Sequence, residues 1–168
     1  MNIRIAKDER DSRSASYIYA MSWKSAYKGI LSEKILEDIP LDRWVDAFNG
    51  NYQTRRFEVA IMNIDGEDIG AGAYGLSRDY HDPAIGEITS MYFLDAVWGK
   101  GYAESLMHFM LGRLKETGCS KVHVWVLKDN RRAQRFYEKC GFQKTQNAKA
   151  TFIKDEENII VEYIKDNI

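Results

Sequence analysis

The stretch Gly86–Leu111, GEITSMYFLDAVWGKGYAESLMHFML, decides the fold of this chain. β-Branched and aromatic residues are dense in its first half, which predicts a strand over Ile85–Leu94. Apolar residues recur at helical spacing in its second half, which predicts a helix over Tyr102–Leu114. Between the two, Gly99 and Gly101 can adopt positive φ and let the backbone approach a ligand closely. Because successive N–H groups of this turn and of the helix N-terminus would point at one place, we interpret the turn as a pyrophosphate site.

The segments after this helix complete one βαβ unit. Thr117-Gly118 ends the helix, and Lys121–Leu127 is a nearly continuous apolar run, as expected for a strand buried on both faces. A strand, a glycine-rich turn, a helix and a strand in this order make the two strands parallel. Asn130 is then a good N-cap for a further helix, which Gly141 ends.

The remaining segments show strand and helix patterns in turn. Alternating apolar residues predict strands over Asn2–Lys7, Arg56–Asn63, Asp68–Ser77, Gln143–Phe152 and Ile159–Ile164. Helical spacing predicts a helix over Asp11–Tyr27, capped by Ser12 or Ser14 and stopped at Gly29, and another from Ser32 to Phe48 that breaks near Pro40 and ends at Gly50-Asn51. We therefore expect an α/β fold: a mixed, mostly antiparallel sheet with one central parallel βαβ unit and helices on both faces.

Two local signals refine the prediction for the strands before the central stretch. Asp65-Gly66 is a strong hairpin signal, so the strands on either side of it should be antiparallel. The small residues of Gly70–Ala73 mark a bulge or a place where something packs very close, or else a flat sheet face under a helix.

Length and composition limit the classes of protein. The 168 residues fit one domain, 1–168, and 45% apolar with 29% charged residues are ordinary for a globular chain. The net charge of −1 predicts neither nucleic acid nor a membrane as partner. The N-terminus lacks a secretory core and no window approaches the roughly 18 to 20 apolar residues that span a bilayer, so we expect a cytoplasmic protein. Cys119, Cys140 and three scattered histidines predict neither a disulfide framework nor a metal site.

Two motifs resemble those of the GNAT-type N-acetyltransferases. That family's pyrophosphate loop, Gln/Arg-x-x-Gly-x-Gly/Ala, falls on Trp98–Ala103, and Asn130–Phe142 is similar to its second signature, Asn-x-x-Ala-x-x-x-Tyr-x-x-x-Gly-Phe. Trp23–Leu31 looks like the first-helix sequence of one broad subset. Trp98 departs from the expected Gln/Arg, which removes a side-chain donor but leaves the backbone donors of the loop.

The resemblance implies acetyl-CoA as co-substrate and no metal. In the family, the central strand splays from its neighbour, so the backbone of Met91 and Phe93 would pair with the pantetheine arm as a strand does. The loop amides would hold the pyrophosphate, with Lys100 as an added cation. Asn130 would reach the pantetheine, although its capping role alone could explain it. The implied cofactor-binding residues are Met91, Tyr92, Phe93, Trp98, Gly99, Lys100, Gly101, Tyr102, Ala103, Asn130 and Tyr137.

Two residues are candidates for proton transfer. Tyr137 matches the family's general acid, and its phenol could protonate the departing thiolate, although its helix stripe also suits a core tyrosine. Glu87, on the strand face that we assign to Thr89 and Met91 as well, could be the general base through a water. Alternatively, its carboxylate pairs with Arg78 or caps neighbouring backbone. A backbone N–H near Phe93 would polarise the thioester carbonyl.

Acceptor binding is the least constrained part of the sequence. Trp23 and Tyr27 lie four apart on one helix face and could line an acceptor pocket, although such a stripe also suits a core. Arg131, Arg132 and Arg135 form a local positive patch that is either solvated or reaches the cofactor phosphates.

We expect an N-acetyltransferase in which an amine of a small molecule or a peptide attacks the thioester directly in a ternary complex. The alternative is a non-catalytic CoA-binding sensor. A Rossmann-type nucleotide binder is disfavoured, because the chain has no second nucleotide half and no acidic residue at the ribose spacing. An exposed final strand would offer an edge for a homodimer.

Overall fold

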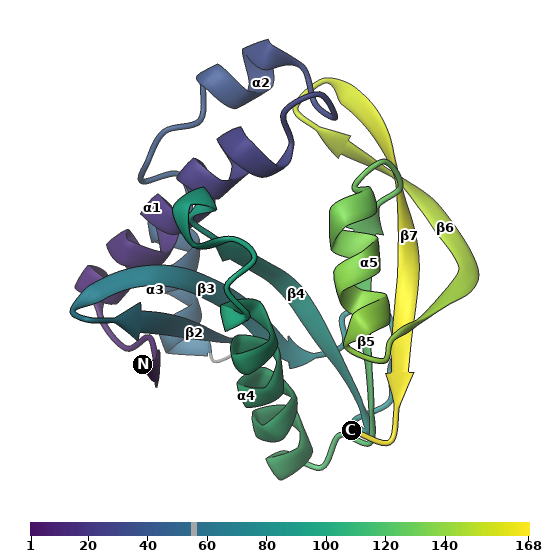
Figure 1. The fold of residues 1–168 in the computed structure, drawn as a ribbon. Coiled ribbons are helices and arrows are strands. Elements are labelled where there is room, and N and C mark those ends of the chain that lie inside the picture. Colours follow the sequence, from purple (N-terminus) through teal and green to yellow (C-terminus); the bar gives the residue numbers. More distant parts are fainter. Residues whose placement is uncertain (55–56) are drawn as a thin grey trace.

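The computed structural model describes residues 1–54 and 57–168, and it shows a mixed sheet with strand order β1-β2-β3-β4-β5-β7-β6 (Figure 1). The strands are β1 (Asn2–Ile5), β2 (Phe57–Ile64), β3 (Glu67–Leu76), β4 (Ile85–Phe93), β5 (Lys121–Leu127), β6 (Gln143–Ile153) and β7 (Glu156–Asp166). The helices are α1 (Glu9–Ala26), α2 (Glu33–Glu37), α3 (Val45–Thr54), the short 3-10 turn η1 (Asp95–Val97), α4 (Tyr102–Glu116) and α5 (Arg131–Lys139). No helix among these residues is long and apolar enough to cross a bilayer.

Strands β4 and β5 form the parallel pair that the sequence predicts, but they pair over a short distance. The register runs from Ile85 opposite Lys121 to Glu87 opposite His123 and then stops. Beyond that point β4 continues alongside β3 and β5 continues alongside β7. Figure 1 shows the two strands diverging from this shared base, so the centre of the sheet opens as a V.

Helices cover both faces of the sheet, as predicted. On one face, α4 and α5 bury Met107, Met110 and Tyr137 against residues such as Val122 and Val124. On the other face, α1 and α3 bury another cluster, made of Ala15, Ile18, Tyr19 and Phe48 against Val59, Ile61, Ala71 and Ala73. Figure 1 shows α2 beside the turn that joins β6 to β7, where the Ser32 N–H donates to Glu156 at 3.4 Å.

A β-bulge in β4 corrects the predicted face of Glu87. Ala73 of β3 pairs with Ser90 and Tyr74 pairs with Ile88, so Thr89 is an extra residue. Consequently Ile88 and Met91 both pack against the α4 side, which strict alternation forbids. Glu87, next to Ile88, lies on the opposite face from Met91, so the prediction that they share a face is wrong.

The start of α1 differs from the sequence prediction. The helix begins at Glu9, and its N-cap is Asp8, whose carboxylate accepts from the Asp11 N–H at 3.0 Å. Ser12 and Ser14, the predicted caps, lie inside the helix and donate to other elements, Ser12 to Asn49 and Ser14 to Asp68. Asp8 precedes Ser12 by one helical turn, and aspartate is as good an N-cap residue as serine.

The second predicted helix is displaced after Pro40. α3 begins at Val45 instead of Leu41, because the Ser16 hydroxyl of α1 donates to the Leu41 carbonyl at 2.8 Å and accepts from the Trp44 N–H at 3.1 Å. The helix also continues past Gly50-Asn51 to Thr54, so the predicted end is wrong. Arg56, the predicted start of the next strand, lies outside the described residues, and β2 is described from Phe57.

The small residues of β3 lie where other side chains pack very close, which is one of the alternatives that the sequence offered for Gly70–Ala73. A Cβ atom on Gly70 would overlap the ring of Phe93, the last residue of β4. A Cβ atom on Gly72 would lie 2.7 Å from the sulfur of Met110 in α4. β3 therefore lets the end of β4 and the middle of α4 sit directly on its surface.

Gly70→Ala should lower the free energy of unfolding by about 1–3 kcal/mol, because the rigid Phe93 ring must move to admit the methyl group. Urea denaturation measures the effect. Gly112→Ala is the matched control, because Gly112 lies in α4 with nothing within 4 Å of an added Cβ, and it should be neutral or stabilising by about 0.5–1 kcal/mol. Equal stability of both variants would contradict the close packing.

Candidate functional site

A cavity of about 420 Å³ lies where β4 and β5 diverge. Its walls come from both strands, from α1, from the loop between β4 and α4, from α5 and from the β6–β7 hairpin. Most of the predicted cofactor-binding residues border it: Met91, Tyr92, Phe93, Trp98, Gly99, Gly101, Tyr102, Ala103, Asn130 and Tyr137. Lys100 is exposed and is not part of the wall.

The loop before α4 has the conformation that its glycines predict. Gly99 and Gly101 have φ values of 76° and 83°, in the region that disfavours side chains. Gly101 is also the N-cap of α4, and among the described residues no side chain caps the first turn. The N–H groups of Tyr102 and Ala103 therefore remain available as donors beside the cavity.

Trp98 takes a role that the sequence did not predict. Its indole N–H donates to the Phe93 carbonyl at 2.9 Å, which ties the loop back to the end of β4. The Arg132 guanidinium of α5 lies over the same indole, 3.3 Å from the ring centroid. Partial burial lowers the pKa of Arg132, and no ion pair joins it to a carboxylate in the described part of the chain. Trp98 is thus a platform that holds one unpaired cation at the cavity.

The Phe93 carbonyl is already fully used by the protein. It accepts from Trp98 and also from the Ser22 hydroxyl of α1 at 2.8 Å, which fills both lone pairs. The Leu94 N–H bonds to Ile69 of β3, so both polar groups of Phe93 point toward the open side of β4. The Phe93 N–H is therefore the group that this residue can offer to a ligand. Ser22 was not a sequence candidate, because only the fold brings α1 to this strand end.

Tyr137 lies in the core and also borders the cavity. It is 6% exposed and packs against Phe136 and Phe142. Burial raises the pKa of its phenol well above the ordinary value, so the group is protonated at neutral pH. Asn130 both caps a helix and borders the cavity. Its side chain caps α5 by accepting from the Ala133 N–H at 3.0 Å.

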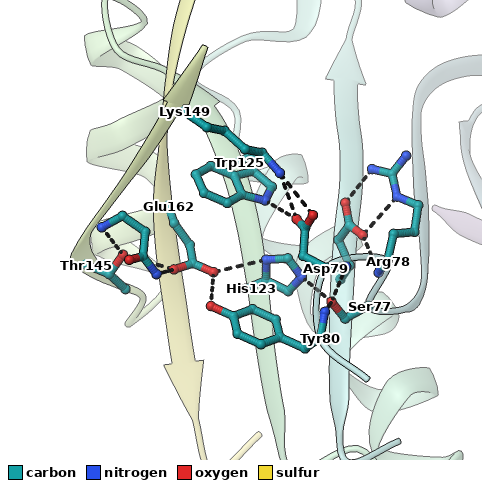
Figure 2. Close-up of polar contacts among 11 residues, drawn as sticks. Ser77, Arg78, Asp79, Tyr80, His123, Trp125, Thr145, Lys149 and Glu162 are labelled. Atoms are coloured by element: carbon teal, nitrogen blue, oxygen red, sulfur yellow. Dashed lines mark hydrogen bonds and ion pairs between the residues drawn. The ribbon is translucent and has the colours of Figure 1, made fainter. Parts of the chain in front are cut away.

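Glu87 is held by Arg78, which is the alternative that the sequence offered. Its carboxylate, 2% exposed, accepts from the Arg78 backbone N–H at 3.2 Å and from the Arg78 side chain at 3.0 and 2.5 Å (Figure 2). Glu87 is not part of the cavity wall. Any proton transfer from the cavity to Glu87 would therefore need a relay.

The sequence analysis missed a second buried carboxylate, that of Glu162. Glu162 of β7 is completely buried and accepts from Tyr80 at 2.7 Å, Thr145 at 3.0 Å and Asn147 at 2.7 Å (Figure 2). Its other neighbour is His123, whose Nδ1 lies 3.3 Å away without hydrogen-bond alignment. The signal was an acidic residue within the apolar run of β7, which is costly unless it finds partners.

Ser77, His123 and Glu162 have the residue types of a hydrolytic triad, but their surroundings favour a structural role. The Ser77 hydroxyl lies 2.8 Å from His123 Nε2 and also accepts from the backbone N–H groups of Asp79 and Tyr80, as in a serine turn. Ser77 does not border the cavity. Burial lowers the pKa of His123, which keeps the ring neutral. The cluster joins the 77–80 loop to β5 and β7.

Aromatic side chains of α1 form the opposite wall of the cavity. The predicted acceptor residues Trp23 and Tyr27 both border it, with ring centroids 4.9 Å apart. The Tyr27 and Tyr92 hydroxyls lie 2.9 Å from each other, which joins α1 to β4. The helix face predicted from spacing is therefore part of the cavity and not only of the core. Among residues 1–54 and 57–168, no group of three or more His, Cys, Asp or Glu side chains is placed to hold a metal ion.

Comparison with known proteins gives a consistent result. The model of the acetyltransferase (GNAT) family matches residues 16–142. An uncharacterized N-acetyltransferase of Mycobacterium tuberculosis is 40% identical over 57 residues, which are 34% of this chain and only 36% of that protein. Two solved structures share the fold: PaiA N-acetyltransferase of Thermoplasma acidophilum with coenzyme A (TM-score 0.73, 20% identity, 96% of this chain and 98% of that one) and YncA of Salmonella typhimurium with acetyl-CoA (TM-score 0.73, 18% identity, 99% and 93%).

Proposed function

Because the chain belongs to the acetyltransferase (GNAT) family, we propose that it transfers the acetyl group of acetyl-CoA to a primary amine of a small molecule or a peptide. The observation that carries this proposal is a cavity that joins three features: the glycine-rich loop, the open edge of β4 and the phenol of Tyr137. PaiA and YncA, which share the fold, were solved with coenzyme A and acetyl-CoA, which supports the choice of co-substrate.

The loop residues fit a pyrophosphate. A Cβ atom on Gly99 or Gly101 would meet nothing within 4 Å, so the space beside the loop is open. The uncapped N–H groups of α4 and the positive end of its dipole favour an anion there. Arg132, which is stacked on Trp98 and has no ion-pair partner among the described residues, supplies a side-chain donor in place of the usual Gln/Arg of the loop, and exposed Lys100 adds a further charge.

Arg132→Ala should weaken acetyl-CoA binding about tenfold, because a charge-assisted hydrogen bond to phosphate is lost. Isothermal titration calorimetry measures the dissociation constant. Arg135→Ala is the matched control, because Arg135 lies on the same helix, is exposed and does not border the cavity. An equal effect of both substitutions would show that Arg132 contributes only general charge.

Transfer needs three groups around the thioester: a hydrogen-bond donor to the carbonyl oxygen, an acid for the departing thiolate and a base for the proton of the amine. The amine attacks the carbonyl carbon, the bond to sulfur breaks, and the thiolate takes a proton. We assign the Phe93 N–H to the carbonyl oxygen, because its own carbonyl is occupied and its N–H faces the open side of β4. We assign Tyr137 as the general acid, because its protonated phenol borders the same cavity.

Tyr137→Phe should lower kcat by about 10²–10⁴-fold and leave the dissociation constant of acetyl-CoA unchanged. Release of the CoA thiol in a coupled assay gives kcat, and calorimetry gives binding. Tyr163→Phe removes a phenol from the same core, one that bonds Gln134 and Glu138 and does not border the cavity, so it should keep kcat. If wild-type protein binds acetyl-CoA but no amine releases CoA, the alternative of a non-catalytic acyl-CoA sensor is favoured.

Glu87 is our proposal for the general base, acting through water because it does not border the cavity. Glu87→Gln should lower kcat/KM at least about a hundredfold, because the amide cannot take the proton of the attacking amine. Arg78→Ala is the control, because it removes the ion-pair partner and keeps the carboxylate. A Glu87→Gln protein with an unchanged kcat/KM would contradict the base role and leave the ion pair with Arg78 as the function of Glu87.

A further inference from the structure

The part of the cavity between α1 and the β6–β7 hairpin has a wall of rings and aliphatic side chains. We call this part the acceptor end. It is lined by Trp23, Tyr27, Tyr92, Trp125, Leu127, Thr151, Ile153 and Ile160. Trp23 of α1 and Trp125 of β5 both line it, so a ligand here would meet aromatic surfaces from two different elements.

The two phenols of this wall and the hydroxyls beside it are satisfied within the protein, whereas the buried indole N–H of Trp23 has no hydrogen-bond acceptor among the described residues. The Tyr27 and Tyr92 hydroxyls bond to each other, and the neighbouring Ser90 hydroxyl bonds to Tyr19 at 2.7 Å. Ser22 is bonded to the Phe93 carbonyl. Burial raises the pKa of Tyr27 and Tyr92, so both phenols stay neutral. The wall thus offers a ligand mainly carbon surface.

None of the described residues that line the acceptor end carries a formal charge. No Asp, Glu, Lys or His belongs to the cavity wall as far as the structure describes the chain, and its one charged residue, Arg132, is stacked on Trp98 beside the loop. An ammonium group far from the reacting amine would find no carboxylate here. A carboxylate on the acceptor would find no cation.

One pair of charged residues beside Trp125, Asp79 and Lys149, forms an ion pair. Behind Trp125, the Asp79 carboxylate accepts from the indole N–H at 2.6 Å and from the Lys149 ammonium at 3.0 Å (Figure 2). The same ammonium lies 4.1 Å from the centre of the indole. Together Asp79 and Lys149 fix the orientation of Trp125 without leaving a free charge for a ligand.

From this wall we infer that the acceptor is a small monoamine whose amine is carried on an uncharged aromatic body, as in the arylalkylamines. The inference rests on the acetyl transfer proposed above and narrows its substrate. Aromatic and aliphatic walls gain by burying an apolar body, whereas a second ammonium or a carboxylate would lose its hydration without a partner. The same apolar surroundings favour the neutral, nucleophilic form of the reacting amine.

Three amines test the inference in the CoA-release assay: 2-phenylethylamine, phenylalanine and putrescine. Phenylalanine has the same ring and amine with an added carboxylate, and putrescine replaces the ring by a second ammonium. We expect kcat/KM for 2-phenylethylamine to exceed that for each of the others at least about tenfold. A higher value for phenylalanine or putrescine would overturn the inference and leave the acetyl transfer intact.

Thr151→Asp places a carboxylate in the acceptor end and should shift the ratio of kcat/KM toward putrescine at least about tenfold. Thr151→Asn is the matched variant, because it has nearly the same shape as Asp without the charge, so the shift should be absent from its ratio. Binding of acetyl-CoA by calorimetry checks that both variants are folded. If Thr151→Asp and Thr151→Asn gave the same ratio of kcat/KM, the lack of charge in the wall would not be what selects the amine.

Direct binding separates the two proposals if no amine releases CoA. In that case the acetyl transfer fails, and calorimetric titration of the three amines into the CoA-saturated protein still tests the acceptor end. Tighter binding of 2-phenylethylamine than of the two charged amines supports the inference. Equal or weaker binding overturns it.

Discussion

The site depends on one constraint, the incomplete pairing of β4 and β5. The two strands share hydrogen bonds only from Ile85 to Glu87 on β4, and each then continues with a different neighbour. An unpaired strand edge in the middle of a sheet is costly unless its backbone groups find other partners. Here a cavity lies where the hydrogen-bond ladder stops, and residues at the end of β4 border it. The V in Figure 1 is therefore the origin of the site and not a defect of the sheet.

Polar contacts fix the positions of the two strands. Trp98 and Ser22 occupy the carbonyl at the end of β4, which removes an acceptor that β5 could otherwise use. The buried Glu162 carboxylate accepts hydrogen bonds from the 77–80 loop and from β6, and it lies beside His123 of β5 (Figure 2). A buried carboxylate with several partners is a strong geometric constraint, because losing one partner leaves an uncompensated charge. The position of β5 is thus set by polar contacts as well as by apolar packing.

The cavity has two chemically different ends, and this difference matches the proposed reaction. Backbone N–H groups, positive-φ glycines and Arg132 surround the loop, where a cofactor carries its negative charge. Neutral rings surround the acceptor end, where an amine must lose its proton before it attacks. Tyr137 and Phe93 border the same cavity, and in the proposed reaction they act on the thiolate and on the carbonyl oxygen. One cavity therefore has a polar end at the loop and an apolar acceptor end.

Local sequence determined the elements and the loop. Strand and helix periods, the Asn130 cap and the two glycines before α4 act over a few residues, so their outcome could be predicted and was found. Tertiary structure decided the rest. The face of Glu87 depended on a bulge set by pairing with β3, and the start of α3 depended on Ser16 of a distant helix. The indole of Trp98 under Arg132, the Ser22 contact and the uncharged acceptor end bring together residues far apart in the chain, and a sequence pattern carries no distance between such residues.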